Sequence, residues 1–388
     1  MMTAKQRFLA AIQRKPADRL PVACHFVMPS FLNRHMNGIS VDDFFDETGV
    51  DPILWTISHT FDPASGSYCD PLQKEIGFLE SKRISSDNWR IYPEPVTDRG
   101  RPATRYRFVT PDGTLSMVLE HDMHSSWVTE YLVKKKSDIE LIAKHMTQPL
   151  CDVDDVNRQA DAYGDRGMMR GWIVCFDIFG QPGTWQDACC LHGTENMIMA
   201  AYDDPGWVHE FLGILNGRKA SYIRSLKGAR YDIHELGGGD ASSTVISPKM
   251  FDAFVAPYDS KLISLLHEAG QRVSYHTCGG MMPLLERIVE MGPDAVETLT
   301  PPAMGGDTDL AEAKRRIGDK VCLIGGFDQY HFLIGCTEAE TRKAVRDCFE
   351  KAGAGGGYIL CISDNFFDAD PKLIKAYADE AKHCVYGR

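Results

Sequence analysis

Short apolar runs alternate with longer amphipathic segments along most of the chain. Eight of the runs have the length and the β-branched or aromatic content of buried strands. They lie near residues 20–27, 51–57, 171–178, 230–236, 272–278, 295–300, 321–325 and 358–363. Helical patterns cover residues 4–14, 248–269, 281–291, 310–317, 338–352 and 371–383. Strands that alternate with helices predict parallel pairing, and eight such units predict an α/β fold of the (β/α)8 TIM-barrel type.

One segment, at about residues 85–135, departs from this alternation. Residues 105–109 and 115–119 are strand-like runs on either side of an Asp-Gly turn signal within residues 111–114, which is typical of a β-hairpin. We expect a β-hairpin insertion here that covers one end of the barrel. No repeat or linker divides the sequence, so residues 1–388 are expected to form a single barrel domain.

Composition and charge argue against several classes of protein. The chain has 388 residues, of which 44% are hydrophobic and 25% charged, and a net charge of -12. This acidic balance argues against a nucleic-acid partner. No apolar stretch approaches the roughly 18–20 residues of a membrane helix, and the first residues carry no secretory signal. We therefore expect no membrane association, a cytoplasmic location, and reduced thiols for the 12 cysteines.

A histidine and two cysteines lie at the ends of predicted strands. His276 and Cys278 end the fifth strand and Cys361 ends the eighth, where a parallel barrel places its active site. Residues two apart in a strand point to the same side, so His276 and Cys278 can approach one ion. An imidazole and two thiolates suit a catalytic zinc ion with an open fourth position. The same pattern also fits a buried histidine with two unrelated core cysteines.

Further ionisable residues fall at predicted strand ends. They are His25, Asp177, His234, Glu235, Asp240, Glu297 and Asp328. Glu297 and Glu235 are candidates for a fourth zinc ligand that substrate displaces, and Glu297 is the one assigned to the metal. The residues expected to bind substrate are His25, Asp177, His234, Glu235, Asp240 and Asp328. Each carboxylate could instead form an ordinary ion pair or hydrogen bond at the barrel mouth, and His25 could instead have a structural role.

Five segments carry a resemblance to a known family. They are residues 3–8, 18–22, 276–280, 325–328 and 355–361. On these residues the chain resembles the uroporphyrinogen decarboxylase superfamily and, within it, the zinc-dependent, corrinoid-linked methyltransferases of the methanol, methylamine and O-demethylase type. The resemblance spans nearly the whole chain and implies a TIM barrel. It also implies that His276, Cys278 and Cys361 are the zinc ligands and catalytic residues.

The decarboxylases of the superfamily use an Arg-rich N-terminal segment to bind the propionates of a tetrapyrrole. The matching residues 23–30 contain no arginine, and the next one is Arg34. A polyanionic substrate needs several fixed cations, so decarboxylation of a porphyrinogen is disfavoured.

The resemblance therefore implies two cofactors, Zn²⁺ and a corrinoid (cobalamin) that a partner protein carries. We favour transfer of a methyl group from a small, ether-like methylated substrate to the corrinoid cobalt, because the extra hairpin could enclose such a substrate. Three alternatives stay open. They are a thiol methyltransferase that uses methylcobalamin, a decarboxylase or lyase without metal, and a barrel that binds a corrinoid partner or metabolite without turnover.

Overall fold

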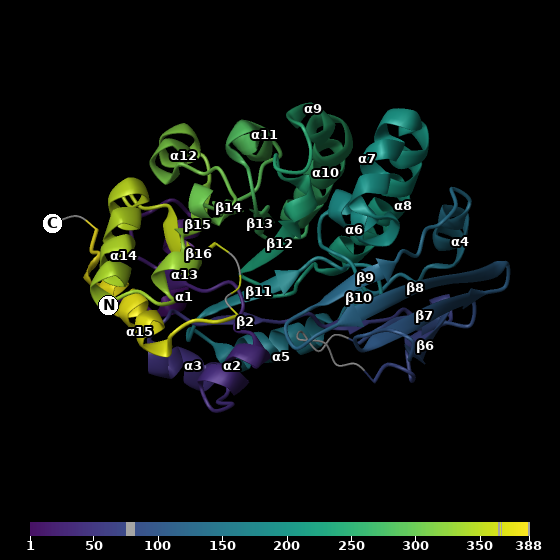
Figure 1. The fold of residues 1–388 in the computed structure, drawn as a ribbon, viewed down its shortest axis with the longest axis horizontal. Helices are drawn as coiled ribbons and strands as arrows, with labels where there is room; N and C mark the ends of the chain where they lie inside the picture. The colour runs from purple at the N-terminus through teal and green to yellow at the C-terminus, as the bar shows by residue number, and fades with distance from the viewer. Residues whose placement is uncertain (75–81, 364, 366, 387–388) are drawn as a thin grey trace.

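The computed structural model describes residues 1–388 except 75–81, 364, 366 and 387–388. In the described residues, eight parallel strands are hydrogen-bonded in the order β1-β16-β15-β14-β13-β12-β11-β2. Their bounds are β1 Val22–Ala23, β2 Ile53–Trp55, β11 Met168–Trp172, β12 Ile233–Gly237, β13 Val273–His276, β14 Ala295–Thr298, β15 Cys322–Phe327 and β16 Tyr358–Ile362. Helices surround these strands (Figure 1). The predicted TIM-barrel class is confirmed.

One helix precedes the first barrel strand, and the other helices lie between or after the strands in the sequence. The helices are α1 Ala4–Ile12, α2 Pro29–His35, α3 Val41–Thr48, α4 Asp138–His145, α5 Val153–Tyr163, α6 Thr184–His192, α7 Thr194–Asp203, α8 Pro205–Ser225, α9 Pro248–Met250, α10 Ala256–Glu268, α11 Leu285–Glu290, α12 Leu310–Ile317, α13 Gln329–Phe332, α14 Glu338–Ala352 and α15 Pro371–His383. Side-chain caps define the first residue of several of these helices. Thr3 and Thr337 form capping boxes at α1 and α14, and Asp309 and Asp370 cap α12 and α15.

Asp51 closes the barrel between β1 and β2, the two strands at opposite ends of the hydrogen-bonded order. Its backbone N–H donates to the carbonyl of Val22 at 2.9 Å, and its side chain adds further contacts. Asp51, which precedes β2, accepts hydrogen bonds from Arg7 of α1 at 2.8 Å and from Arg19 at 2.7 Å. Its other carboxylate oxygen accepts the backbone N–H of Val22 in β1 at 3.0 Å. The Asp51 side chain is 4% exposed. A buried ion-pair network therefore joins helix, first strand and second strand.

An antiparallel sheet lies beside the barrel (Figure 1) and is inserted between β2 and β11. It contains β6 Arg90–Val96, β7 Ala103–Thr110, β8 Gly113–His121 and β9 Ser126–Glu130, paired in that order. The predicted hairpin is confirmed as β7 and β8. Its corner is formed by Pro111 and Asp112, because Gly113 already pairs with Thr110. Two smaller antiparallel pairs join β3 (His59–Thr60) to β10 (Leu150–Cys151) and β4 (Ser67–Cys69) to β5 (Ile84–Ser86).

The third barrel strand was predicted at residues 171–178, and this is wrong. The strand is β11, Met168–Trp172, and the chain leaves the sheet at Ile173. The carbonyls of Val174 and Cys175 accept hydrogen bonds from Lys219 and Arg218 of α8 instead of from a neighbouring strand. A buried loop with satisfied carbonyls can be as apolar as a strand, so the pattern alone did not separate the two.

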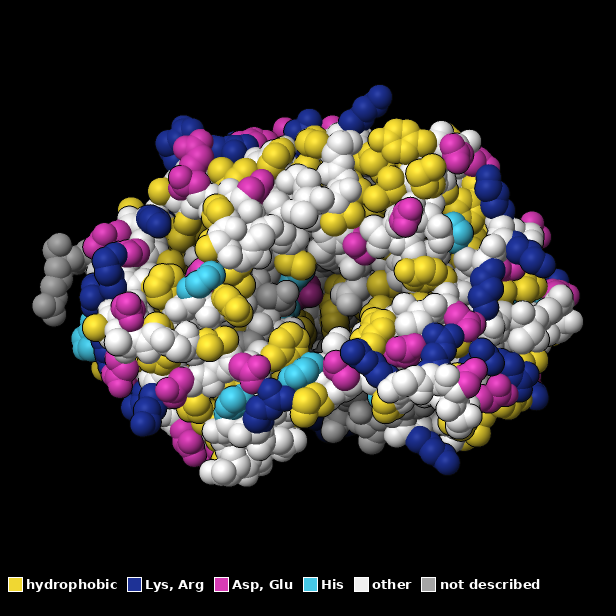
Figure 2. All heavy atoms as spheres, viewed as in Figure 1, with side chains coloured by type: hydrophobic (Ala, Val, Ile, Leu, Met, Phe, Trp, Pro, Cys, Tyr) yellow, Lys and Arg dark blue, Asp and Glu magenta, His cyan; other side chains and the backbone are white. Residues whose placement is uncertain are grey.

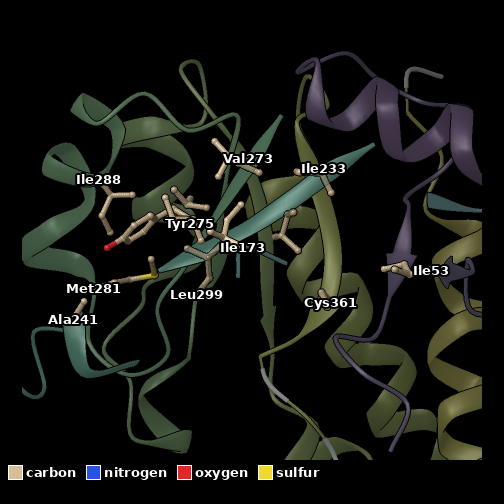
Figure 3. Close-up of a cluster of buried hydrophobic side chains, with 14 of the residues drawn as sticks. Ile53, Ile173, Ile233, Ala241, Val273, Tyr275, Met281, Ile288, Leu299 and Cys361 are labelled. Atoms are coloured by element: carbon tan, nitrogen blue, oxygen red, sulfur yellow. The ribbon is translucent and has the colours of Figure 1, made fainter. Parts of the chain in front are cut away.

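Strand alternation decides which side chains reach the interior of the barrel. Tyr275 of β13 lies against Ile288 and Met281, outside the strands (Figure 3), and its hydroxyl donates to buried Asp259 of α10 at 3.1 Å. The next residue along the strand, His276, therefore points to the opposite face, into the barrel.

Candidate functional site

A cavity of about 620 Å³ opens at the carboxyl ends of the barrel strands; we call it the mouth cavity. Figure 2 shows that this face of the molecule is hollowed at its centre. His25 after β1, Glu235 of β12, His276 of β13 and Cys278 after β13 all line it. The structure thus brings together residues that lie far apart in the sequence, at the edge of the barrel where active sites of this fold occur.

His276 is held by the side chains around it. Its Nδ1 lies 3.2 Å from Glu297 Oε1 and 3.9 Å from Glu235 Oε2, and its ring is hydrogen-bonded to the Cys278 side chain. Burial alone would lower the pKa of His276, but Glu235, Cys278 and Glu297 together raise it well above its usual value. One imidazole and one thiol therefore lie side by side on the cavity wall.

Close backbone packing brings Cys278 into this position. A Cβ atom on Gly239 would lie 2.7 Å from Cys278 Sγ, and one on Gly237 would lie 2.3 Å from the His276 carbonyl oxygen. Both distances are too short for a side chain at either position. The glycine run after β12 therefore allows the loop to pass directly over the histidine and the thiol.

Arg170 of β11 forms the charged floor beneath these residues. Its Nη2 donates to Glu235 Oε2 at 2.6 Å and to Glu297 Oε1, and its side chain is 2% exposed. The guanidinium also stacks on Trp55, 4.4 Å from the ring centre. Burial would lower the pKa of Arg170, but Glu297 and Glu235 raise it. The floor is therefore one cation shared by two carboxylates.

The two carboxyls differ in their titration. Burial raises the pKa of Glu235 to about 7, although His276 and Arg170 act to lower it. Burial also acts to raise the pKa of Glu297, but Arg170 and the hydrogen bond with His276 hold it well below its usual range. His25, whose Nε2 lies 3.5 Å from Glu235 Oε2, has its pKa lowered well below normal by burial and is neutral at pH 7.

The donors present suit a metal ion. Among the described residues, the ligand atoms of His25, Glu235, His276 and Glu297 lie within 4.8 Å of one another. This four-residue cluster includes neither Cys278 nor Cys361. Cys278 is hydrogen-bonded to His276 at the cavity wall. Imidazole, thiolate and carboxylate are the donor types that zinc binds in proteins, so the residues fit the implied ion.

Cys361 occupies a different environment from Cys278. It lies in β16 opposite Ala23 of β1 and Gly326 of β15. It belongs to the buried apolar cluster that Figure 3 draws, and its thiol interacts with the charge of Arg170. The predicted zinc ligands therefore fall into a joined pair, His276 and Cys278, and a third residue deeper in the barrel. Their joint role as ligands stays a prediction.

The other predicted residues are spread more widely. Asp240 lines the mouth cavity. Asp177 lines a neighbouring cavity, where it pairs with Arg218 and accepts the indole N–H of Trp89. His234 is fully buried against Tyr231 and does not line the mouth cavity.

Asp328 has a structural position. It caps α13 and accepts hydrogen bonds from the backbone and ring of His331, and it too lies outside the lining of the mouth cavity.

A model of the uroporphyrinogen decarboxylase (URO-D) family matches residues 181–383, a little over half of the chain. The chain belongs to this family. Membership confirms the superfamily predicted from five segments, of which residues 276–280, 325–328 and 355–361 lie inside the match. The matched residues include β12 to β16, and hence Glu235, His276, Cys278 and Glu297.

Curated relatives of this URO-D family chain carry the name uroporphyrinogen decarboxylase. The protein of Thioalkalivibrio sulfidiphilus is 28% identical over 188 residues, which is 46% of this chain and 49% of the relative. That of Microcystis aeruginosa is 25% identical over 190 residues, or 48% and 51%. The chain spans about half the length of the curated relatives it matches.

Among solved structures, a methyltransferase from Methanosarcina mazei aligns over 99% of both chains with a TM-score of 0.59 and 14% sequence identity. This likeness shows the fold. In the described residues of the URO-D family chain, no helix is both long and apolar enough to cross a membrane.

Sequence reasoning missed Arg170 as part of the site. The signal was present, because Arg170 is a charged residue inside the apolar segment 168–174. A strand placed at residues 171–178 left it outside. Trp172 of β11, Gln181 of the following loop and Gln186 of α6 also line the mouth cavity. They were missed because single residues of these types carry no spacing signal.

Proposed function

We propose that this URO-D family protein is a zinc-dependent methyltransferase that moves a methyl group from a small, ether-like substrate to the cobalt of a corrinoid protein. The observation that carries the proposal is the pairing of His276 with Cys278 on the wall of an open cavity, backed by Glu297 and Glu235. The methyltransferase name of a solved structure with the same fold supports it.

The surrounding residues orient the histidine for metal binding. Its Nδ1 faces Glu297, which leaves Nε2 as the ligand nitrogen, and a carboxylate on the other ring nitrogen is the usual support of a metal-bound histidine. Arg170 holds Glu297 in place. His276, Cys278 and Cys361 are the proposed zinc ligands, and Glu235 or Glu297 the proposed fourth ligand before substrate binds.

In the proposed reaction, the methyl group would leave the ether oxygen and pass to the corrinoid of the partner protein. The oxygen would keep the electrons of the C–O bond, and the reduced corrinoid would supply the electron pair of the new bond. Zinc, when bound, would supply a Lewis acid for the departing oxygen. Glu235, which lines the mouth cavity, is the carboxyl placed to deliver the proton that the oxygen takes up.

A decarboxylase is the second candidate, because the curated relatives carry that name. The charge of the site argues against a tetrapyrrole substrate. Among the described residues that line the mouth cavity there is no lysine or arginine, and Arg170 below it is already shared by two carboxylates. A molecule with many carboxylates would meet like charge there.

Metal analysis of purified protein tests the proposal. We expect about one zinc per chain, with loss of zinc in His276→Ala and Cys278→Ala. Cys69→Ala is the matched control, since Cys69 is an exposed cysteine and its removal should leave zinc unchanged. Zinc that persists in both site variants would rule out these ligands.

Activity is then tested with a Co(I) corrinoid protein and candidate methyl ethers. The absorption spectrum of cobalt reports methyl-Co(III). Formation of this species by the native protein, and its loss in Cys278→Ala, is the expected result. Release of CO2 from carboxylated substrates by protein without zinc would favour the decarboxylase.

A further inference from the structure

A second cavity, of about 470 Å³, lies next to the mouth cavity. The two share Trp172 and Gln181 in their walls. The second cavity is bounded by the loop after β11, by residues 124–126 at the turn between β8 and β9, and by residues 82–84. It therefore lies between the barrel and the inserted antiparallel sheet, and no step of the proposed reaction uses it.

Most of its wall is apolar and partly aromatic. The side chains on this wall include Met28, Ile84, Val174, Phe176, Ile178 and Phe179. Phe176 is fixed by Trp89 and Phe108 of the inserted sheet region, with ring centres 6.2 and 5.6 Å away. Such a wall suits the flat or branched apolar body of a small molecule.

Arg83 gives the same cavity a cationic group with unused hydrogen-bonding capacity. Its Nε donates to Asp70 Oδ2 at 2.6 Å, and its side chain is 4% exposed. Its Nη2 is buried without a hydrogen-bond partner. An unpaired guanidinium N–H in a low-dielectric wall is costly, and a carboxylate matches its geometry.

The other ionisable groups facing this cavity set the net charge that a ligand would meet. Arg218 is neutralised by Asp177, and Asp70 offsets Arg83. Burial lowers the pKa of His59 to about 3, so this histidine is neutral. Lys82 and His124 also line the cavity. Among the described residues, basic groups therefore outnumber acidic ones around this cavity, which suits an anionic ligand of low charge.

We propose that the second cavity binds an aromatic monocarboxylate, with its carboxylate at Arg83 and Lys82 and its ring against the apolar wall next to Trp172. The site would stand whether or not the protein transfers methyl groups. If methyl transfer occurs, the shared wall places the far end of the ligand toward the mouth cavity.

Titration calorimetry with benzoate tests the site directly on the full-length protein. Benzamide is the neutral probe of the same shape, and benzylamine is the cationic one. We expect benzoate to bind at least tenfold more tightly than either, because only benzoate carries the charge that Arg83 and Lys82 match. Equal affinity for benzoate and benzamide, or no binding of benzoate at millimolar concentration, would overturn the proposal.

Two variants locate the binding. Arg83→Gln should weaken benzoate binding at least tenfold. Lys82→Gln should weaken it severalfold, and it tests the site even if Arg83→Gln does not fold, because Lys82 is an exposed residue. Lys343→Gln, which removes an exposed lysine elsewhere, is the matched control.

His276→Ala separates this site from the proposed methyl-transfer site. It alters the mouth cavity, so it should remove zinc and leave benzoate affinity unchanged. Benzoate binding that is lost in His276→Ala but kept in both Arg83→Gln and Lys82→Gln would place the carboxylate in the mouth cavity and refute the second site.

Discussion

Asp259 shows how a single buried carboxyl links stability to pH. It is 1% exposed, accepts the backbone N–H of Thr184 at 3.2 Å, and receives the hydroxyl hydrogen of Tyr275. Burial raises its pKa from 3.8 to about 6. Between these two pH values the folded protein binds more protons at this group than the unfolded chain does, so stability falls as pH rises.

We therefore predict that Asp259→Asn reduces the loss of stability between pH 4 and pH 7. The difference in unfolding free energy between variant and native protein should move in favour of the variant by up to about 3 kcal/mol over this range, since one pKa unit is about 1.4 kcal/mol. Urea unfolding at several pH values measures it. If the difference in unfolding free energy between the two proteins does not change with pH, the raised pKa of Asp259 is contradicted.

At the scale of single residues, the sequence allowed the histidine, cysteine and carboxylate residues of the candidate site to be predicted. His276, Cys278, Glu235 and Glu297 were predicted at strand ends, and the structure brings them together at the barrel mouth. Arg170 could not be placed in the same way, because only the three-dimensional register puts it between two carboxylates from other strands. Spacing along one strand carries no information about partners on another.

At the scale of secondary-structure elements, side chains of α8 hold the loop of residues 173–181, which lies between the mouth cavity and the second cavity. Its buried Lys219 donates to the carbonyls of Val174 and Gln181, each at 2.9 Å, and pairs with Asp187 at 2.8 Å. Asp187 in turn accepts the N–H groups of Phe176 and Gln181. One ion pair thus holds both ends of the loop.

We predict that Lys219→Met destabilises the protein by about 3–5 kcal/mol, because it leaves Asp187 buried without its cation. Loop residues 173–181 should also become susceptible to limited proteolysis. Mass mapping of the first cleavage sites checks this, with Lys382→Met, at a more exposed ion pair, as control. First cleavage elsewhere would show that Lys219 does not hold this loop.

Sequence patterns predicted the bounds of some helices and strands correctly and those of others incorrectly. The bounds predicted for α12, α14 and α15 agree with the structure, because each begins at a side-chain cap that is readable in sequence. The third strand was misplaced because the loop after it is buried and apolar. Its backbone is satisfied by side chains of α8, a contact that no local pattern reveals.

For the whole molecule, Asp51 is the residue that closes the barrel between β1 and β2. We predict that Asp51→Asn lowers the free energy of unfolding by about 3–5 kcal/mol, because Arg7 and Arg19 lose their shared carboxylate in a buried setting. Chemical denaturation measures the change. Asp368→Asn, at an exposed pair with Arg34, should have little effect, and a similar loss in both variants would contradict a special role for Asp51.

The order of strands also constrains how the chain reaches this structure. β1 finds its hydrogen-bonded neighbour in β16, where Ala23 pairs with Cys361. During synthesis β1 must therefore wait, with one edge unpaired, until residues 358–362 of β16 have left the ribosome. Such late closure slows folding and leaves an apolar edge open to aggregation. The Asp51 network, formed by residues 7–51, holds β1 by its other edge, the one that faces β2, during this delay.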